Sequence, residues 1–300
     1  MINNIENITF GVELETTIPA TAQVGVGQYH NGTNANTARV GSELKHFPKF
    51  GSASWKTEHD GSIRGMEAGH RACEFVSPIL KGEAGIAHLI EFVEFLQSIG
   101  AKVNASCGMH IHIGAQTAHG ATADLEAYIE RLVRLVAFNS KALYAQTGTI
   151  ARENGVYCRK LGAETKTIVK KMKKEKRVIG ATALNRYHIL NLTNLPRTGT
   201  VEFRCFAGTL NTNKVLVHLF SVLVLCLVAR SAKTPADWEN KTLTGSKALT
   251  NLLKVRPVTQ IVGSPIMAGR FSKMFGKALE MAAKYDAQQA GLDLQMLTKV

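Results

Sequence analysis

Cysteine is scarce in this chain, and the few cysteines form no familiar pattern. The 300 residues include five cysteines, an odd number, widely spaced and without a Cys-x-x-Cys pair. This distribution argues against a disulfide scaffold or a zinc ribbon and favours a reducing compartment, so we expect a cytoplasmic protein. Cys107 and Cys205 lie close to ionisable residues in the sequence, but no base is visibly paired with either thiol. We therefore assign neither a nucleophilic role.

Long uninterrupted apolar runs are also missing. The most apolar stretch, Val215 to Ala229, is interrupted by His218 and is shorter than the roughly 20 residues that cross a membrane. It predicts a buried helix and no membrane partner. The first residues lack a basic region followed by an apolar stretch, so we expect no signal peptide.

Acidic residues are outnumbered, with 23 Asp and Glu against 36 Lys and Arg and a formal charge of +13. Much of the excess comes from residues 159–177. A solvated helix or mobile loop would explain this segment, and so would a basic lid or docking surface for an anionic ligand such as nucleic acid. No aromatic residue lies between Lys160 and Arg177, which weakens a base-stacking interpretation.

Three short stretches each place two ionisable side chains on one face of a predicted strand. Side chains alternate across a strand with period two, so residues i and i+2 point the same way. The pairs are Glu13 with Glu15, His110 with His112, and Glu202 with Arg204. The residues between and beside them have core-type side chains: Val12, Leu14, Met109, Ile111, Ile113, Val201, Phe203 and Cys205. We therefore expect the opposite face of each strand to be buried.

A single sheet containing all three strands would carry three Glu, two His and one Arg on its polar face. A merely solvated face would more often carry Thr, Lys, Ser and Gln. Carboxylates mixed with imidazole suit a divalent metal that also holds phosphate oxygens. Taken separately, the three pairs could be solubilising charges on an edge strand, ordinary half-exposed histidines and a surface ion pair. Their combination favours an enzyme.

The rest of the chain predicts a mixed α/β organisation without an internal repeat. We expect a strand over 9–18 that ends at Pro19, a long loop over 20–54, and strands near 72–77, 187–192 and 200–206. Apolar spacing predicts helices over 83–99, 123–144 and 213–229. Residues 231–300 give weaker helical signals and carry no chemical motif.

Six pieces of the sequence, taken together and in order, resemble the amidoligase family of carboxylate–amine ligases, relatives of glutamine synthetase and γ-glutamylcysteine ligase. They are Phe-Gly-Val-Glu-Leu-Glu15, Asp60-Gly-Ser62, Glu74-Phe-Val-Ser-Pro78, Cys107-Gly-Met-His-Ile-His112, Tyr187-His-Ile-Leu-Asn191 and Thr200-Val-Glu-Phe-Arg204. Each piece alone is a weak signal, and the joint order is fairly specific. The resemblance covers residues 9 to about 230.

The resemblance implies an α+β fold, with a curved antiparallel sheet and helices on its outer face, like the glutamine synthetase catalytic domain. Residues 1–230 would form the catalytic domain, with a basic insertion at about 159–177. Residues 231–300 would be a helical extension packed on the same domain. ATP and Mg²⁺ or Mn²⁺ would sit on the concave face. A carboxylate would attack the γ-phosphate to give an acyl phosphate, from which an amine displaces phosphate.

The resemblance also implies roles for individual residues. Glu13, His110 and Glu202 would hold one ion, and Glu15 with Glu74 a second, completed by Asp60 or Glu67; Asp60 is equally suited to capping its own turn. His112, Arg186, Asn191 and Asp60 would contact the nucleotide, phosphate or substrate. Arg204, with Glu202 and Glu13, would act on the transferred phosphoryl group or a substrate carboxylate.

Two alternatives from other classes stay open. A metal-dependent hydrolase or nuclease could use the same carboxylate–histidine cluster, and a non-catalytic basic protein on a ligase-like fold could bind nucleic acid. For the ligase, the carboxylate and amine substrates could be a small amino acid, a peptide, a protein side chain or a modified nucleobase.

Overall fold

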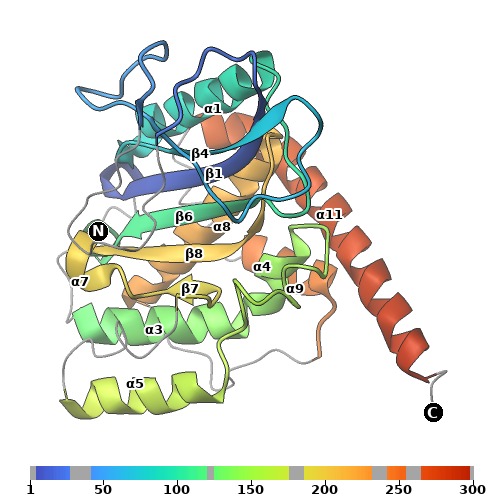
Figure 1. Ribbon diagram of the computed structural model, residues 1–300. Coiled ribbons are helices and arrows are strands. Elements are labelled where there is room, and N and C mark those ends of the chain that lie inside the picture. Colours follow the sequence, from blue (N-terminus) through green and yellow to red (C-terminus); the bar gives the residue numbers. More distant parts are fainter. Residues whose placement is uncertain are drawn as a thin grey trace.

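An eight-stranded sheet forms the centre of the computed structural model, which describes residues 5–27, 42–119, 125–175, 186–231, 242–254 and 265–297 (Figure 1). The strands are β1 (Thr9–Pro19), β2 (Ser42–Glu43), β3 (Lys56–Glu58), β4 (His70–Val76), β5 (Leu80–Lys81), β6 (Gly108–Gly114), β7 (Leu190–Asn191) and β8 (Thr200–Ala207). Their order is β2-β3-β4-β1-β6-β8-β7, with β5 also paired to β1, and every pair of neighbours is antiparallel.

Helices cover one face of this sheet. The longer ones are α1 (Gly82–Ser98), α3 (Leu125–Phe138), α5 (Ala163–Glu175), α8 (Thr212–Ser231), α9 (Gly245–Leu253) and α11 (Pro265–Leu297). The short ones are η1 (Ile5–Asn7), α2 (Ala115–His119), α4 (Ser140–Ala145) and α7 (Leu195–Thr198). Figure 1 shows α1, α8 and α11 behind the strands, with α3 and then α5 beyond the β7 side. The α+β class and the antiparallel sheet with helices are therefore confirmed, whereas the likeness to glutamine synthetase stays a prediction.

Residue alternation along the strands produces the core as expected. The apolar positions of β1, β6 and β8 are all at most 1% exposed: Val12, Leu14, Met109, Ile111, Ile113, Val201, Phe203 and Cys205. They join the helices in one hydrophobic cluster. The polar face is also shielded from solvent, because Glu13 and Glu15 are each only 7% exposed. Both faces of the central strand are thus enclosed, and charged groups on it must be paired or bind a ligand.

Helix α8 is the apolar helix expected over 213–229. Length and composition alone would allow residues 212–230 to cross a membrane, but most of this stretch is buried inside the fold. It packs against α3 and α11. We conclude that α8 is the central helix of the core.

Two local expectations were less accurate. The single helix expected over 123–144 is divided at Asn139, where the side-chain amide donates to the Leu135 carbonyl at 2.8 Å. The strand expected over 187–192 is reduced to the two residues of β7. The turn after it is the short helix α7, which Gly199 ends in a left-handed conformation with φ of 68°. The division at residue 230 into catalytic domain and extension stays a prediction.

A buried histidine on α8 predicts a pH-dependent stability. His218 is fully buried, with Nδ1 2.9 Å from Oε1 of Gln146 and its ring stacked on Phe206. Burial, with a smaller contribution from Lys214, holds the pKa of His218 well below its ordinary value. Below about pH 6.5, the imidazole of His218 is therefore protonated in the unfolded chain but stays neutral in the folded chain. As a result, the free energy of unfolding falls by about 1.4 kcal/mol for each unit by which the pH decreases.

We expect His218→Asn to remove this slope between pH 6 and pH 5. Asparagine keeps a polar group near Gln146 but does not titrate, so the comparison with the wild type cancels the contribution of other groups. Urea denaturation at several pH values measures the difference. Parallel pH profiles for the two proteins would contradict the assignment.

Candidate functional site

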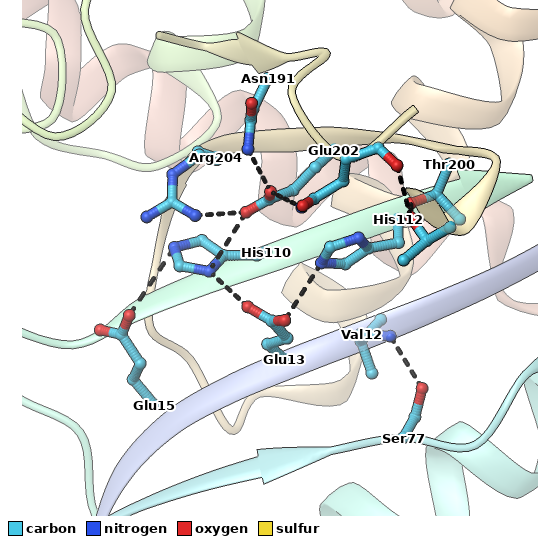
Figure 2. Close-up of polar contacts among 12 residues, drawn as sticks. Val12, Glu13, Glu15, Ser77, His110, His112, Asn191, Thr200, Glu202 and Arg204 are labelled. Carbon is cyan, nitrogen blue, oxygen red and sulfur yellow. Dashed lines mark hydrogen bonds and ion pairs between the residues drawn. The ribbon is translucent and has the colours of Figure 1, made fainter. Parts of the chain in front are cut away.

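Strand register brings the predicted ionisable residues onto one face of the sheet. In the β1–β6 pair, Glu13 lies opposite His110, and in the β6–β8 pair, His112 lies opposite Glu202. On the other side of β1, Glu15 lies opposite Glu74 of β4. Residues from four strands, 189 positions apart in sequence between Glu13 and Glu202, therefore form one cluster. Figure 2 shows its members from β1, β6 and β8.

Glu13 is the centre of the cluster. Its Oε2 lies 2.9 Å from Nδ1 of His110, and its Oε1 lies 3.2 Å from Nε2 of His112. The same His110 ring faces two further carboxylates, with Nδ1 3.7 Å from Glu202 Oε1 and Nε2 3.7 Å from Glu15 Oε1. Both imidazoles therefore lie between carboxylates rather than in solvent, as Figure 2 shows.

Glu202 is held by polar side chains from β7, from the turn that follows β7, and from β8 itself. Asn191 Nδ2 donates to Glu202 Oε2 at 2.6 Å, and Asn194 Nδ2 donates to the same oxygen at 3.2 Å. The Arg204 guanidinium donates to the other oxygen through Nη1. The Nε atom of Arg204 is buried and, among the described residues, has no hydrogen-bond partner. Arg204 thus keeps one donor for a bound group.

A second group of carboxylates lies at the β3–β4 side of the cluster. Glu15 accepts a 2.6 Å hydrogen bond from the Gly108 backbone N–H, and Glu74 is 2% exposed. Asp60 caps its own turn by accepting from the Ser62 N–H at 2.6 Å, yet it also offers an oxygen to this group. The turn cap expected of Asp60 is therefore present, and its role as a metal ligand stays a prediction. Glu67 is instead an exposed partner of Lys102, at 2.6 Å.

Neighbouring charges keep the central carboxylates ionised. Burial by itself would raise the pKa of Glu13, but the imidazoles of His112 and His110 outweigh it and hold that pKa well below its ordinary value. Burial and the charge of Glu13 raise the pKa of Glu202, whereas His112, Arg204 and His110 bring it to a net lowered value. Like charges are therefore confined together, a situation that a cation would relieve.

Three sets of side chains could each hold a metal ion, because one ligand atom from each member lies within 4.8 Å of the others. The sets are Glu13–His112–Glu202, Glu13–His110–Glu74 and Glu15–Asp60–Glu74. They share Glu13 and Glu74 and so form a continuous row. Carboxylate oxygens with imidazole nitrogens fit Mn²⁺ and Mg²⁺. His110 and His112 are thus both candidate ligands, whereas the motif argument placed only His110 in this role.

A cavity of about 860 Å³ opens beside this row. Glu13, His112, Glu202 and Arg204 line one part of it, while the exposed cations Lys56, Arg186 and Arg197 line its outer parts. Asn191 also borders the cavity, but Asp60 does not. The volume lies in the range of small-molecule sites, so a nucleotide-sized ligand would fit.

A family model described as "Putative amidoligase enzyme" matches residues 6–222. The chain belongs to this amidoligase family. The resemblance drawn from the six motifs is thereby confirmed, and a ligase-type function follows at that level of detail. A search of curated protein sequences found no match.

Glu58 is a buried carboxylate of this amidoligase that lies near the candidate metal sets but in none of the six motifs. It is 1% exposed and lies opposite Glu74 in the β3–β4 pair, so it places a further buried carboxylate beside the row. Its position two residues before Asp60, in a short alternating stretch, was the available signal.

The environment of the cysteines disfavours a nucleophilic role. All five are free and buried. Burial raises the pKa of the Cys107 and Cys205 thiols above the ordinary value, which disfavours the reactive thiolate.

Proposed function

We propose that this amidoligase is an ATP- and divalent-metal-dependent carboxylate–amine ligase with a glutamine synthetase-like catalytic fold. The observation that carries the proposal is the row of buried carboxylates and imidazoles beside a cavity of nucleotide size. A hydrolase would need a similar metal cluster, but it would not explain the membership of the ligase family.

Metal binding is supported by the chemistry of the donor set. Glu13, Glu15, Glu74 and Glu202 offer hard oxygen ligands, and the histidines offer nitrogen ligands that favour Mn²⁺ over Mg²⁺. When bound, such cations would neutralise phosphate oxygens and align the γ-phosphate. The protein supplies the preorganised carboxylates and fixes their direction through backbone and amide donors, as Gly108 does for Glu15 and Asn191 for Glu202.

The reaction needs positioning and charge neutralisation more than covalent chemistry from the protein. An oxygen of the substrate carboxylate attacks the γ-phosphorus of ATP, and ADP leaves, giving an acyl phosphate. The amine nitrogen then attacks the acyl carbon, phosphate leaves, and the nitrogen loses a proton. Arg204 can donate to the transferred group because its Nε is buried and has no partner within the described residues. Arg186 and Asn191 line the same cavity, where they can contact the nucleotide or the substrate.

Phosphate release tests the proposal directly. The enzyme is incubated with ATP, Mn²⁺ and a panel of carboxylates and amines, and phosphate is measured with and without each amine. A ligase gives amine-stimulated phosphate release and a new amide product. Cleavage of nucleic acid without ATP would support the hydrolase instead, and nucleic-acid binding without either reaction would support a non-catalytic protein.

We further propose that α5 is a docking surface for a polyanion, such as nucleic acid. Thr165 and Val169 are buried, and α5 packs against α3. Four of its lysines point outward: Lys166, Lys170, Lys171 and Lys174 are exposed. In Figure 1, α3 separates α5 from the sheet, which favours a docking surface over a lid. Residues 176 and 177, the end of the predicted basic segment, lie outside the described residues.

Replacing those four lysines with glutamine should weaken binding to a polyanion without altering ATP affinity. If about four contacts to a single strand are lost, the slope of log affinity against log salt should become shallower by about 3. Fluorescence anisotropy with single-stranded nucleic acid at several salt concentrations measures it. An unchanged slope would make α5 a solvated face only.

A further inference from the structure

Arg152 is a cationic residue beside the carboxylate row that lies in none of the strands and in none of the six motifs. The side chain of Arg152, in the segment after α4, reaches β8, where Nη2 donates to the Arg204 carbonyl at 3.0 Å and Nε approaches the Cys205 carbonyl at 3.5 Å. A methyl group at Gly108 would lie 2.9 Å from Arg152 Nη2 and 3.3 Å from both Glu15 Oε2 and His110 Nε2. The guanidinium therefore borders the site.

The part of β8 that Arg152 contacts is irregular. Met109 pairs with Phe206 and Ile111 with Phe203, so the β6–β8 register shifts at Arg204 and Cys205. Backbone groups in such a bulge lose part of their regular strand pairing. By donating to the carbonyls there, Arg152 fixes the backbone from which the Arg204 side chain reaches Glu202 and the cavity.

The segment bearing Arg152 is in turn attached to α11. Met281, Tyr285 and Gln288 have the i, i+4, i+7 spacing of one helix face. The Tyr285 hydroxyl donates to Glu153, which also pairs with Lys160. Gln288 accepts from the Ile150 N–H at 3.1 Å and donates to the Gly148 carbonyl at 3.3 Å. A methyl group at Gly148 would lie 2.9 Å from the Met281 sulfur, so the helix and the segment are closely packed.

We propose that α11 is a positioning element of the site: it holds residues 148–153 so that Arg152 fixes the β8 bulge and the direction of Arg204. The family model matches residues 6–222, and α11 follows that region in the sequence. The proposed support therefore comes from a part of the chain that the family model does not cover. Figure 1 shows the segment after α4 beside α11 at the same end of the sheet. The effect on ligand binding rests on the proposed function, whereas the effect on the backbone does not.

The test compares Tyr285→Phe/Gln288→Ala and Arg152→Met with the wild type. Lys284→Ala is the control, since that side chain is on the solvent side of α11, paired with Glu280. Amide hydrogen exchange should become at least about tenfold faster over residues 148–153 in the double variant and over residues 203–207 in both, with β1 and β4 unchanged. Tyr285→Phe alone serves if the double variant unfolds.

Nucleotide binding provides the second readout. The dissociation constant of the non-hydrolysable ATP analogue AMP-PNP with Mg²⁺ should rise by about fivefold to tenfold in both variants, whereas Mn²⁺ binding without nucleotide should not weaken. Unchanged exchange over 203–207, or equal weakening of Mn²⁺ and nucleotide binding, would overturn the positioning role. If the wild type binds no AMP-PNP, the proposed function fails, and the exchange data alone decide whether α11 and Arg152 hold the bulge.

Discussion

Glu13→Gln is expected to lower amine-stimulated phosphate release by at least about a hundredfold, because the Glu13 carboxylate belongs to two of the three candidate metal sets. Glutamine keeps the shape of the side chain and removes the negative charge. Neither imidazole beside it can replace that charge. Mn²⁺ binding, measured by titration calorimetry, should weaken in parallel, which gives a readout that does not depend on knowing the amine.

The same substitution should leave the fold intact. Glu13 is packed among like charges, and its charge raises the pKa of Glu202, which is a sign of repulsion. Removing one of two repelling charges offsets the loss of the contacts with His110 and His112. We therefore expect the metal-free variant to melt within a few degrees of the wild type.

Glu130→Gln is the matched control. Glu130 is also buried, at 8% exposure, but it pairs with Arg134 on α3, away from the cluster. Its replacement should cost stability without lowering Mn²⁺ affinity. Glu202→Gln should behave like Glu13→Gln. Near-normal turnover in both cluster variants would refute the metal-ligand assignment.

Period-two alternation explains why the central part of the site could be predicted from sequence. Glu13, His110 and Glu202 each stand between apolar neighbours in a stretch whose alternation predicts a strand with one apolar face. Once the strands share a sheet, these side chains must point to the same side. The family resemblance then supplied strand adjacency, which alternation alone does not contain.

Tertiary contacts explain what the sequence could not reveal. Glu58 lies beside the row only because β3 pairs with β4 in a register that places it opposite Glu74. Arg152 reaches the site because a segment held by α11 crosses to β8, a contact between residues far apart in sequence. Neither residue lies in a motif. His112 was expected near the nucleotide, and the structure additionally places it with Glu13 and Glu202.

Removing divalent cations is expected to lower the thermal midpoint of the wild type by about 4 °C. A ligand that binds only the folded state stabilises it by about 2.7 kcal/mol at a hundredfold excess over its dissociation constant. For a chain of 300 residues, an unfolding entropy of about 2.1 cal/mol/K per residue makes each kcal/mol correspond to roughly 1.6 °C. The cluster supplies the reason: its carboxylates are ionised and confined together, and a cation relieves their repulsion. Scanning calorimetry with Mn²⁺ and then with chelator measures the shift.

Variants at the two ends of the row separate its metal sets. Glu202→Gln removes a ligand from the set with His112, and Asp60→Asn removes one from the set with Glu15. If two ions bind independently, each substitution should abolish part of the Mn²⁺-dependent increase in the thermal midpoint, and the double variant should abolish most of it. If only one ion binds, either each substitution alone should have the same effect as the double variant, or one of the two substitutions should have no effect. Glu67→Gln, an exposed partner of Lys102, should keep the wild-type shift. A wild-type midpoint that is equal in Mn²⁺ and in chelator would refute a resident metal, because a cation that binds this row must stabilise the folded state.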